Sequence, residues 1–360
     1  MKIMTVLGTR PEIIRLSRII PLLDENCDHV LLHTCQNFDR HLSDIFFEEL
    51  GVRAPDIKLD IQETRAMDQI GRIISGVDQA MEEHEPDRLL ILGDTNSGLS
   101  AICAKRRGIS VYHMEAGNRC FDDRVPEEVN RRVIDHSSDV LMPYTERSRF
   151  NLINEGIPSN RIFTIGNPIK EVLDYYSDEV ESSNSLDSYS VARGEYFLVT
   201  LHRAENVDVE TRLLNMVKSL KRIHQEYQIP VIWSVHPRTR DKLDKLPVEI
   251  GEGVILTEPL GLFDFVNLEK NARCVLSDSG TVQEECCIFG IPNVTLRDVT
   301  ERPETMDVGS NILAGDDEIS ILRSVRIAIE QGTDWIVPNE YKYQNVSRTV
   351  LKIITSYFRH

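Results

Sequence analysis

Short apolar runs alternate with amphipathic segments along almost the whole chain, and this alternation constrains the fold more than any other feature. Runs rich in Val, Ile and Leu are typical of buried strands, and the segments between them place apolar residues at helical spacing. Strands that alternate with helices form a parallel sheet covered by helices. The expected strands are 2–8, 29–34, 88–92, 109–113, 140–142, 161–165, 196–201, 231–235, 254–257, 274–277 and 293–296.

The expected helices and the chain length indicate two halves with the same architecture. The chain has 360 residues, which is about twice the usual domain size. A Ser/Asp/Glu-rich stretch at 177–195 interrupts the alternation, and we expect an exposed, flexible segment near the domain junction. The main helices of the first half are expected at 11–24, 40–50, 67–84, 97–105, 126–136 and 145–155, and an amphipathic segment at 345–357 ends the chain.

Six of the expected strands run into short polar turns. In open parallel sheets, ligands bind beyond the carboxyl ends of the strands. The first half thereby supplies the candidates Asp94, Glu115 and Glu127 with Arg10 and Arg131, and the second half supplies His202, His236, Arg238 and the turn Asp278–Thr281.

The turn Asp278–Thr281 opens an expected helix in the second half. Free N–H groups and the helix dipole at such an end favour negative charge, so we place the diphosphate of a phosphorylated ligand there. Glu285 lies about two turns into that helix, where a carboxylate could accept hydrogen bonds from ribose hydroxyls. The alternative for Glu285 is an ordinary helix-surface carboxylate.

The most charged stretch, His113–Arg132, follows one of these strands. It holds five carboxylates and four arginines in 20 residues. Pro126 fits the first position of a helix, and Glu127 then shares a helix face with Arg131. A surface helix with weak ion pairs is the alternative interpretation.

Composition excludes several classes of function. The formal net charge of −17 argues against broad binding to nucleic acid or anionic membranes. The longest apolar runs are too short for a transmembrane helix or a signal peptide. Seven scattered cysteines favour reduced thiols in a cytosolic protein. Glycine-rich dinucleotide and P-loop motifs, a metal-binding histidine pair and a Gly-x-Ser-x-Gly elbow are all absent, so we expect no NAD, no metal, no other cofactor and no serine-hydrolase chemistry.

Nine short motifs together resemble one family, the non-hydrolysing UDP-N-acetylglucosamine 2-epimerases. The resemblance covers residues 1 to about 315, and it implies the two-domain GT-B fold with the active site in the cleft between two Rossmann-like domains. It also implies a homodimer. The motifs are Gly8–Glu12, Gly93–Thr95, Glu115–Gly117, Pro126–Arg131, Gly166–Asn167, His202–Arg203, Asp278–Gly280, Gln283–Glu285 and Thr300–Glu304.

The resemblance also implies domain boundaries and residue roles. An N-terminal domain at 1–170, joined by a terminal helix at 345–360, would precede a UDP-binding domain at 171–344. The family eliminates UDP to leave a 2-acetamidoglycal and then adds UDP back. The implied catalytic residues are Asp94, Glu115, Glu127, Arg131 and His202, and the implied substrate-binding residues are Arg10, Arg15, His236, Arg238, Ser279, Gly280, Thr281, Glu285 and Arg302.

Two single positions and one five-residue segment depart from the family pattern. Arg15 stands where a catalytic-site lysine is usual, and Thr281 replaces a second glycine. Cys35-Gln-Asn-Phe-Asp39 replaces a Gln-His-Arg motif that helps bind an activating UDP-sugar in bacterial relatives. This form resembles the capsule and O-antigen branch that converts UDP-2-acetamido-2,6-dideoxy-L-talose to UDP-N-acetyl-L-fucosamine, and we expect that substrate.

Other functions remain as alternatives at this stage. The first is the epimerisation of UDP-N-acetylglucosamine to UDP-N-acetylmannosamine. A GT-B glycosyltransferase, a hydrolysing epimerase and a non-catalytic UDP-sugar sensor are more remote.

Overall fold

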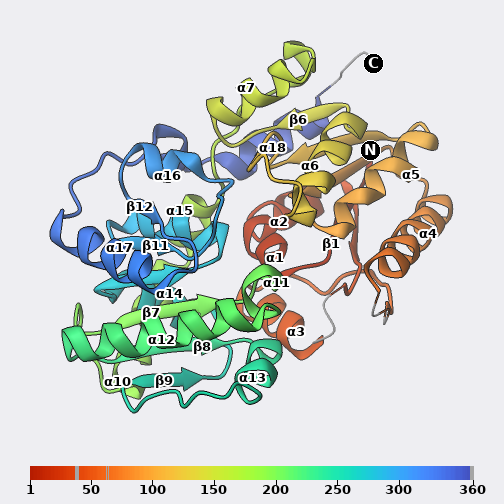
Figure 1. Ribbon diagram of the computed structural model, residues 1–360. Helices are drawn as coiled ribbons and strands as arrows, with labels where there is room; N and C mark the ends of the chain where they lie inside the picture. The colour runs from red at the N-terminus through yellow and green to blue at the C-terminus, as the bar shows by residue number, and fades with distance from the viewer. Residues whose placement is uncertain (37–39, 62, 64, 357–360) are drawn as a thin grey trace. The chain divides into compact units, whose positions relative to one another are not determined.

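The computed structural model describes residues 1–36, 40–61, 63 and 65–356. The chain divides into two compact units, one formed by Met1–Asp174 with residues 339–356 and the other by Tyr175–Pro338 (Figure 1). Each unit contains a parallel six-stranded sheet, which confirms the expected α/β class. The expected boundaries, 1–170 with 345–360 and 171–344, remain predictions of the segments that fold independently.

The sheet of the first unit has the strand order β3-β2-β1-β4-β5-β6. The order reverses between β1 and β4, and this reversal makes the position beyond their carboxyl ends the expected ligand-binding point. Met4 of β1 pairs with Val30 on one side and Leu89 on the other. The strands are β1 (Lys2–Leu7), β2 (Asp28–His33), β3 (Ile57–Lys58), β4 (Arg88–Leu92), β5 (Ser110–Met114) and β6 (Val140–Met142).

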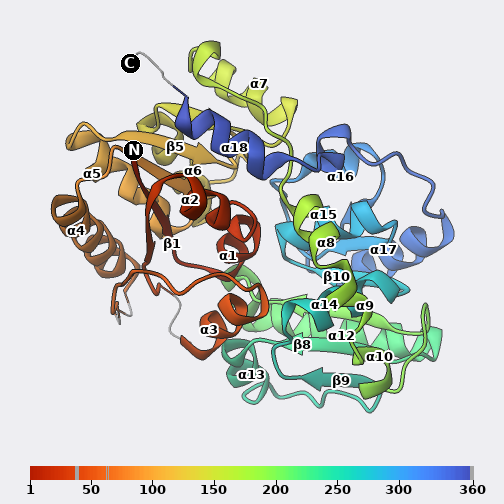
Figure 2. The ribbon, with the colours of Figure 1, turned by 180° about the vertical axis from the view of Figure 1, so that it is seen from behind.

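Helices cover both faces of this first sheet. Figures 1 and 2, seen from opposite sides, show α4, α5 and α6 over one face and α1, α2 and α18 over the other. The helices are α1 (Arg10–Leu16), α2 (Ile20–Asn26), α3 (Arg40–Glu49), α4 (Ala66–His84), α5 (Ala101–Arg106), α6 (Pro126–Ser137), α7 (Glu146–Asn154), α8 (Ile169–Tyr175) and α18 (Val346–Thr355), with short 3-10 turns η1 (Asn96–Ser100), η2 (Ser159–Arg161) and η3 (Asn339–Lys342).

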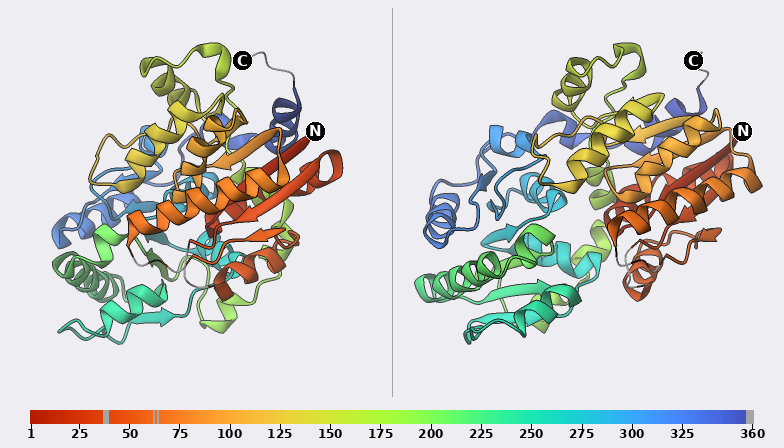
Figure 3. Two further views of the ribbon diagram at one scale, coloured as in Figure 1. Left: turned by 90° about the vertical axis from the view of Figure 1, so that its right-hand side faces the viewer. Right: turned by 45° about the vertical axis from the view of Figure 1, so that its right-hand side comes forward.

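The sheet of the second unit has the order β12-β11-β10-β7-β8-β9, so the same reversal falls between β7 and β10. Trp233 of β8 is fully buried in the larger of the two hydrophobic core clusters of this unit. The six strands lie side by side in their own sheet (Figure 3). They are β7 (Phe197–Leu201), β8 (Val231–Val235), β9 (Val254–Thr257), β10 (Cys274–Ser277), β11 (Asn293–Thr295) and β12 (Asn311–Leu313).

The helices of the second unit also form two layers. Apolar residues of α12 and α17 pack on one sheet face, and those of α14 and α15 pack on the other. The helices are α9 (Ser177–Glu181), α10 (Ser185–Ser188), α11 (Ala204–Val207), α12 (Glu210–Tyr227), α13 (Pro237–Leu243), α14 (Leu262–Asn271), α15 (Gly280–Phe289), α16 (Pro303–Asp307) and α17 (Glu318–Glu330).

Two expectations about elements were wrong, and a third was confirmed only in part. The single helix expected at 11–24 is two helices, because Pro21 at the start of α2 cannot donate to a preceding carbonyl and its ring crowds the turn before it. The strand expected at 161–165 forms only one bridge, Leu141 to Ile162. The segment 177–195 is mostly exposed and lies next to the boundary between the two units, as expected, but it contains α9 and α10, which pack on α14. There the hydroxyl of Ser185 donates to Oδ1 of Asn267 at 2.9 Å.

The terminal helix α18 lies on the first unit, beside α2 (Figure 2). The backbone N–H of Ser347 donates to Glu171 of α8 at 2.8 Å, and the Arg88 guanidinium contacts the carbonyl oxygen of Ile354. No helix among the described residues is long and apolar enough to cross a membrane.

Candidate active site

Glu12 joins the turns that follow β1 and β4, at the strand-order reversal of the first unit. Its Oε2 accepts from the backbone N–H of Gly8 at 3.0 Å and from the hydroxyl of Thr9 at 2.7 Å, and its Oε1 accepts from Thr95 at 3.1 Å. Burial raises the pKa of Glu12 to about 7, against the opposing effect of these hydrogen bonds. Glu12 ends the motif Gly8–Glu12, but its sequence position alone did not indicate a site residue.

Glu115 sits in the turn directly after β5 with its side chain buried. Its carboxylate forms a close ion pair with the guanidinium of Arg15, which comes from α1. Arg15 also lies over the ring of Tyr144, 5.6 Å from the centroid. The φ angle of Glu115 is +64°, in the left-handed region that non-glycine residues seldom adopt. Backbone strain of this kind costs about 1–3 kcal/mol and is typical of functional sites.

Asp94 follows β4 and forms a close ion pair with Arg131 of α6. Arg131 also donates to Glu128 at 2.8 Å, and Glu128 accepts the backbone N–H groups of Cys120 and Phe121 at 3.0 Å each. Burial alone would raise the pKa of Glu128, but these donors hold it below its usual range. Glu128 therefore fixes Arg131, and Arg131 in turn fixes the Asp94 carboxylate.

Glu127 and Arg10 occupy the first turns of their helices. Glu127 is half-buried in the first turn of α6, one turn before Arg131 on the same helix face. Arg10 begins α1, and its guanidinium lies 5.7 Å from the ring centroid of Phe46. Both side chains thus start from the carboxyl edge of the first sheet.

His202 and Asp278 meet across the strand-order reversal of the second unit. His202 follows β7 and Asp278 follows β10, and Nδ1 of His202 lies 3.1 Å from Oδ1 of Asp278. Asp278 also accepts the backbone N–H groups of His202 and Arg203 and the amide of Asn206. Burial would raise the pKa of Asp278, but His202 and these donors lower it to about 2. The buried carboxylate thus fixes an imidazole that is itself exposed.

The turn before α15 places Ser279, Gly280 and Thr281 at the helix N-terminus, as the sequence analysis expected. A Cβ atom on Gly280 would come within 2.9 Å of Oε1 of Glu301, so the backbone here packs against that carboxylate. Arg302 is buried and forms a close ion pair with Glu284 of the same helix.

Glu285 is buried in the second turn of α15, next to a second buried carboxyl group on α14, Glu269. Burial and the nearby Glu285 raise the pKa of Glu269 well above its usual value. The thiol of Cys286 lies 3.4 Å from Oε1 of Glu269. The structure therefore does not agree with a solvent-exposed surface carboxylate at position 285.

His236 and Arg238 make local contacts at the start of α13. Nδ1 of His236 accepts the backbone N–H of Arg238 at 3.3 Å and caps the helix. The Arg238 guanidinium forms a close ion pair with Asp208, and its side chain is more than half exposed. Both residues follow β8, the neighbour in the sheet of β7, which His202 follows.

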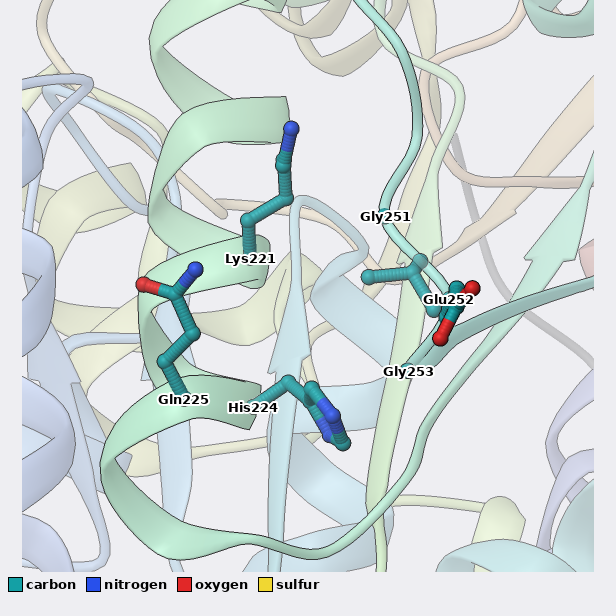
Figure 4. Close-up of a pocket in the computed structure, with 7 residues that line it drawn as sticks. Lys221, His224, Gln225, Gly251, Glu252 and Gly253 are labelled. Carbon is teal, nitrogen blue, oxygen red and sulfur yellow. The ribbon is translucent and has the colours of Figure 1, made fainter.

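A surface hollow in the second unit lies away from these turns. It is lined by Lys221, His224 and Gln225 of α12 and by residues 251–254, which lead into β9 (Figure 4). This is the amino end of β9, whereas ligands of such sheets bind at the carboxyl ends. Among the described residues, no group of three or more His, Cys, Asp or Glu side chains is arranged to hold a metal.

Comparison with known proteins identifies relatives along the whole chain. A family model described as UDP-N-acetylglucosamine 2-epimerase matches residues 23–355. The UDP-N-acetylglucosamine 2-epimerase of Methanocaldococcus jannaschii is 39% identical over 366 residues, 99% of each chain. The UDP-2,3-diacetamido-2,3-dideoxy-D-glucuronate 2-epimerase of Pseudomonas aeruginosa is 36% identical over 334 residues, 91% of this chain and 92% of its own.

A solved structure shows the same fold. The crystal structure of the M. jannaschii enzyme in complex with UDP-GlcNAc and UDP superimposes with a TM-score of 0.93, and the match covers 99% of both chains at 39% identity. This similarity and the two parallel sheets confirm the GT-B-like fold that the sequence motifs implied.

Proposed function

This chain belongs to the UDP-N-acetylglucosamine 2-epimerase family, and on that premise we propose that it inverts carbon 2 of a UDP-linked 2-acetamido sugar. The observation that carries the proposal is that a different set of functional side chains follows the strands of each sheet. Carboxylates held by arginines follow β4 and β5, and a helix N-terminus with a fixed histidine follows β10 and β7. We propose that the two sets act on one bound substrate.

The carboxylates suit the proton transfers of an elimination and re-addition. A base removes the proton from carbon 2 while the bond between carbon 1 and the UDP oxygen breaks, which leaves a 2-acetamidoglycal and UDP. UDP then adds back to carbon 1 as a proton reaches carbon 2 from the other face. We assign these transfers to the carboxylates Asp94, Glu115 and Glu127. The assignment requires that each lies within hydrogen-bonding reach of the reacting carbon or its neighbours when the sugar is bound.

The second set suits the departing diphosphate. Negative charge grows on UDP as its bond to the sugar breaks, and fixed N–H dipoles and cations stabilise that charge. We assign this role to the N–H groups at Ser279–Thr281, to Arg302 and to His202, with Arg10 from the first unit. The buried carboxyl group of Glu285 is assigned to the ribose hydroxyls.

Two sugars are candidates, and different observations favour them. Full-length relatives at 39% and 38% identity are named UDP-N-acetylglucosamine 2-epimerases, which favours UDP-N-acetylglucosamine. The residues Asn37, Phe38 and Asp39 favour UDP-2-acetamido-2,6-dideoxy-L-talose and the product UDP-N-acetyl-L-fucosamine, although they lie outside the described residues. The relative from P. aeruginosa is named for a third UDP-sugar, UDP-2,3-diacetamido-2,3-dideoxy-D-glucuronate.

The assay that tests this proposal supplies each UDP-sugar separately and follows both by proton NMR. Conversion of either sugar to its 2-epimer supports the proposed reaction, and the ratio of kcat/KM values assigns the substrate. A methyl group in an apolar pocket discriminates by only about 10–200-fold, whereas a polar pocket that has lost a hydroxyl partner discriminates more strongly. Release of free sugar and UDP without an epimeric nucleotide sugar would contradict the proposal.

We also propose a setting for the enzyme. The resemblance of the motif at residues 35–39 to the capsule and O-antigen branch supports a role in surface polysaccharide synthesis in the cytoplasm. The family resemblance supports a homodimer. Light scattering of the purified protein at micromolar concentration tests the dimer, and a mass of one chain, 41.2 kDa, would contradict it.

A further inference from the structure

His113 is a buried histidine in the first unit to which the proposed mechanism assigns no role. It stands near the end of β5 with 1% of its surface exposed. Its Nδ1 lies 2.8 Å from Oδ1 of Asp135, and its Nε2 lies 2.8 Å from the carbonyl oxygen of Gly93. A carbonyl oxygen only accepts hydrogen bonds, and so does an ionised carboxylate. Each ring nitrogen of His113 therefore faces an oxygen atom that can accept a hydrogen bond.

Asp135, the partner of His113, reaches a second turn. Its Oδ2 accepts the backbone N–H of Gly117 at 3.1 Å and lies 2.7 Å from Nη2 of Arg119. Arg119 also holds Glu155 through contacts of 2.8 and 2.6 Å. Asp135 is fully buried, and although burial alone would raise its pKa, the charged neighbours hold it below its usual range. The carboxylate is thus ionised and surrounded by donors.

The two turns reached in this way are those that carry the proposed catalytic carboxylates. Gly93 directly precedes Asp94, so His113 holds the peptide group that joins them. Gly117 closes the turn that begins at Glu115, whose left-handed backbone needs support from its surroundings. Asp135 lies one turn after Arg131 on the same face of α6, and Arg131 holds the Asp94 side chain.

We propose that His113 and Asp135 are positioning residues of the epimerase site, which hold the turn of Asp94 and the turn of Glu115 in register with each other. The inference rests on the proposed function and deepens it. Neither side chain needs to touch the substrate, because both act through the backbone of the residues that do. A displacement of about 1 Å at a reacting group can lower a rate about 10²-fold.

Two substitutions of His113 each remove one of its two hydrogen-bonding contacts and keep the other. The amide nitrogen of His113→Asn can replace Nδ1 and keep the contact with Asp135, whereas that of His113→Gln can replace Nε2 and keep the contact with the Gly93 carbonyl oxygen. Each variant loses one of the two tethers, so we expect each to lower kcat about 10²-fold while the Kd for UDP stays unchanged. The UDP contacts were assigned mainly to the second unit, which these substitutions do not alter.

A matched control is a carboxylate that contacts the same strand, β5, from the residue before β6. Asp139 is also a buried carboxylate that accepts a backbone N–H of β5, from Val111 at 2.9 Å, but it lies at the amino end of the strand. Asp135→Asn should lower kcat as the His113 variants do, whereas Asp139→Asn should leave kcat unchanged. An equal loss in both Asp variants would show a general structural role and would overturn the proposal.

A double-mutant comparison separates positioning from stability. If His113 acts on Asp94 through the Gly93 carbonyl oxygen, His113→Asn, which loses that contact, should lower kcat strongly in the unaltered protein and add no further loss in an Asp94→Asn background. Circular dichroism and UDP titration establish that each variant is folded, and Asp135→Asn replaces any His113 variant that fails to fold. Full additivity of the two losses would overturn the proposal, and so would unchanged kcat in folded variants.

The two levels of inference fail in different ways. If the unaltered protein epimerises no UDP-sugar, the proposed function falls and takes this role with it. If the unaltered protein is active and the His113 and Asp135 variants retain its kcat, the positioning role alone is wrong.

Discussion

A carboxylate that exchanges a proton with carbon must be held in one place and kept ionised until the substrate arrives. Glu115 is held in place by the guanidinium of Arg15, which in turn lies over the ring of Tyr144. Arginine cannot itself transfer a proton at ordinary pH, whereas the lysine usual at this position in the family could. At this residue we therefore assign charge and orientation to Arg15 and proton transfer to the carboxylate.

Isosteric removal of single carboxylates tests the catalytic assignments. Asp94→Asn, Glu115→Gln and Glu127→Gln should each lower kcat by about 10²–10⁴-fold, because general acid–base groups contribute about that much. The Kd for UDP should change far less. Steady-state kinetics and UDP titration measure both quantities, and a variant that keeps the full rate would show that its residue only makes structural hydrogen bonds.

The buried Glu12 predicts a specific dependence of stability on pH. Its pKa is about 7 in the folded chain, whereas an unfolded glutamate has a pKa of 4.5, so between these values the folded state keeps a proton that the unfolded state loses. The contribution of Glu12 to the free energy of unfolding therefore falls as the pH rises through this window, by on the order of 3 kcal/mol.

Urea denaturation of the unaltered protein and of Glu12→Gln measures this effect. The stability of the unaltered protein relative to the variant should decline between pH 4.5 and pH 8, because glutamine does not titrate. A difference that stays constant with pH would contradict the assignment.

Among the elements, α15 does most to shape the proposed diphosphate site. Its first residue, Gly280, packs against Glu301, which is itself held by Arg297 at 2.8 Å and Arg203 at 3.3 Å. A side chain at this position would push against a carboxylate that cannot easily move. The helix N-terminus thus depends on glycine for the close approach of its backbone.

Gly280→Ala should therefore weaken UDP binding by about tenfold, the effect of a 1.4 kcal/mol change, while kcat at saturating substrate stays nearly unchanged. A suitable control is Gly71→Ala in α4, where an added Cβ meets no atom within 4 Å. The control should leave UDP binding unaltered. Calorimetric titration with UDP compares the two variants, and equal binding by both would remove the packing argument.

Sequence patterns predicted most elements but not those that depend on tertiary contacts. The runs at 88–92, 140–142, 231–235, 254–257 and 274–277 were predicted with the bounds that the structure shows. β3 has two residues, too few to show a period. The break before Pro21 was missed because the apolar pattern continues across it.

The same limit applies to the site. Polar turns after strands indicated Asp94, Glu115 and His202, because strand ends share one edge of a sheet. The role of Glu12 depends on Thr95, 83 residues away, and that of His113 on Asp135 and Gly93. A local pattern cannot reveal such partners, although both residues lie inside candidate stretches of the sequence, Gly8–Glu12 and His113–Arg132.

At the scale of the whole molecule, the chain uses one architecture twice, with its reversal between β1 and β4 and again between β7 and β10. The chemistry differs between the copies, since carboxylate–arginine pairs follow the strands of the first unit and a histidine with a helix N-terminus follows those of the second. The two sheets thus carry two separate sets of side chains, to which we assign proton transfer in the first unit and UDP binding in the second.

The kinetics of the whole enzyme should lack activation by a second UDP-sugar. Asn37 and Phe38 bring no positive charge, and Asp39 would repel a diphosphate, where activated relatives have His and Arg. Rate against substrate concentration should therefore be hyperbolic. Sigmoidal kinetics with UDP-N-acetylglucosamine, together with a preference for that sugar, would overturn both this expectation and the assignment to the 6-deoxy sugar.

The central claim is that the reaction passes through elimination of UDP, and conversion of the substrate in D2O tests it most directly. If carbon 2 loses its proton to a carboxylate that exchanges with solvent, the epimeric product carries deuterium at carbon 2, and free UDP with 2-acetamidoglycal accumulates in small amounts. NMR of the product and mass spectrometry of the quenched reaction detect these species. An epimer that keeps its original hydrogen at carbon 2, with no glycal at any time, would contradict the account.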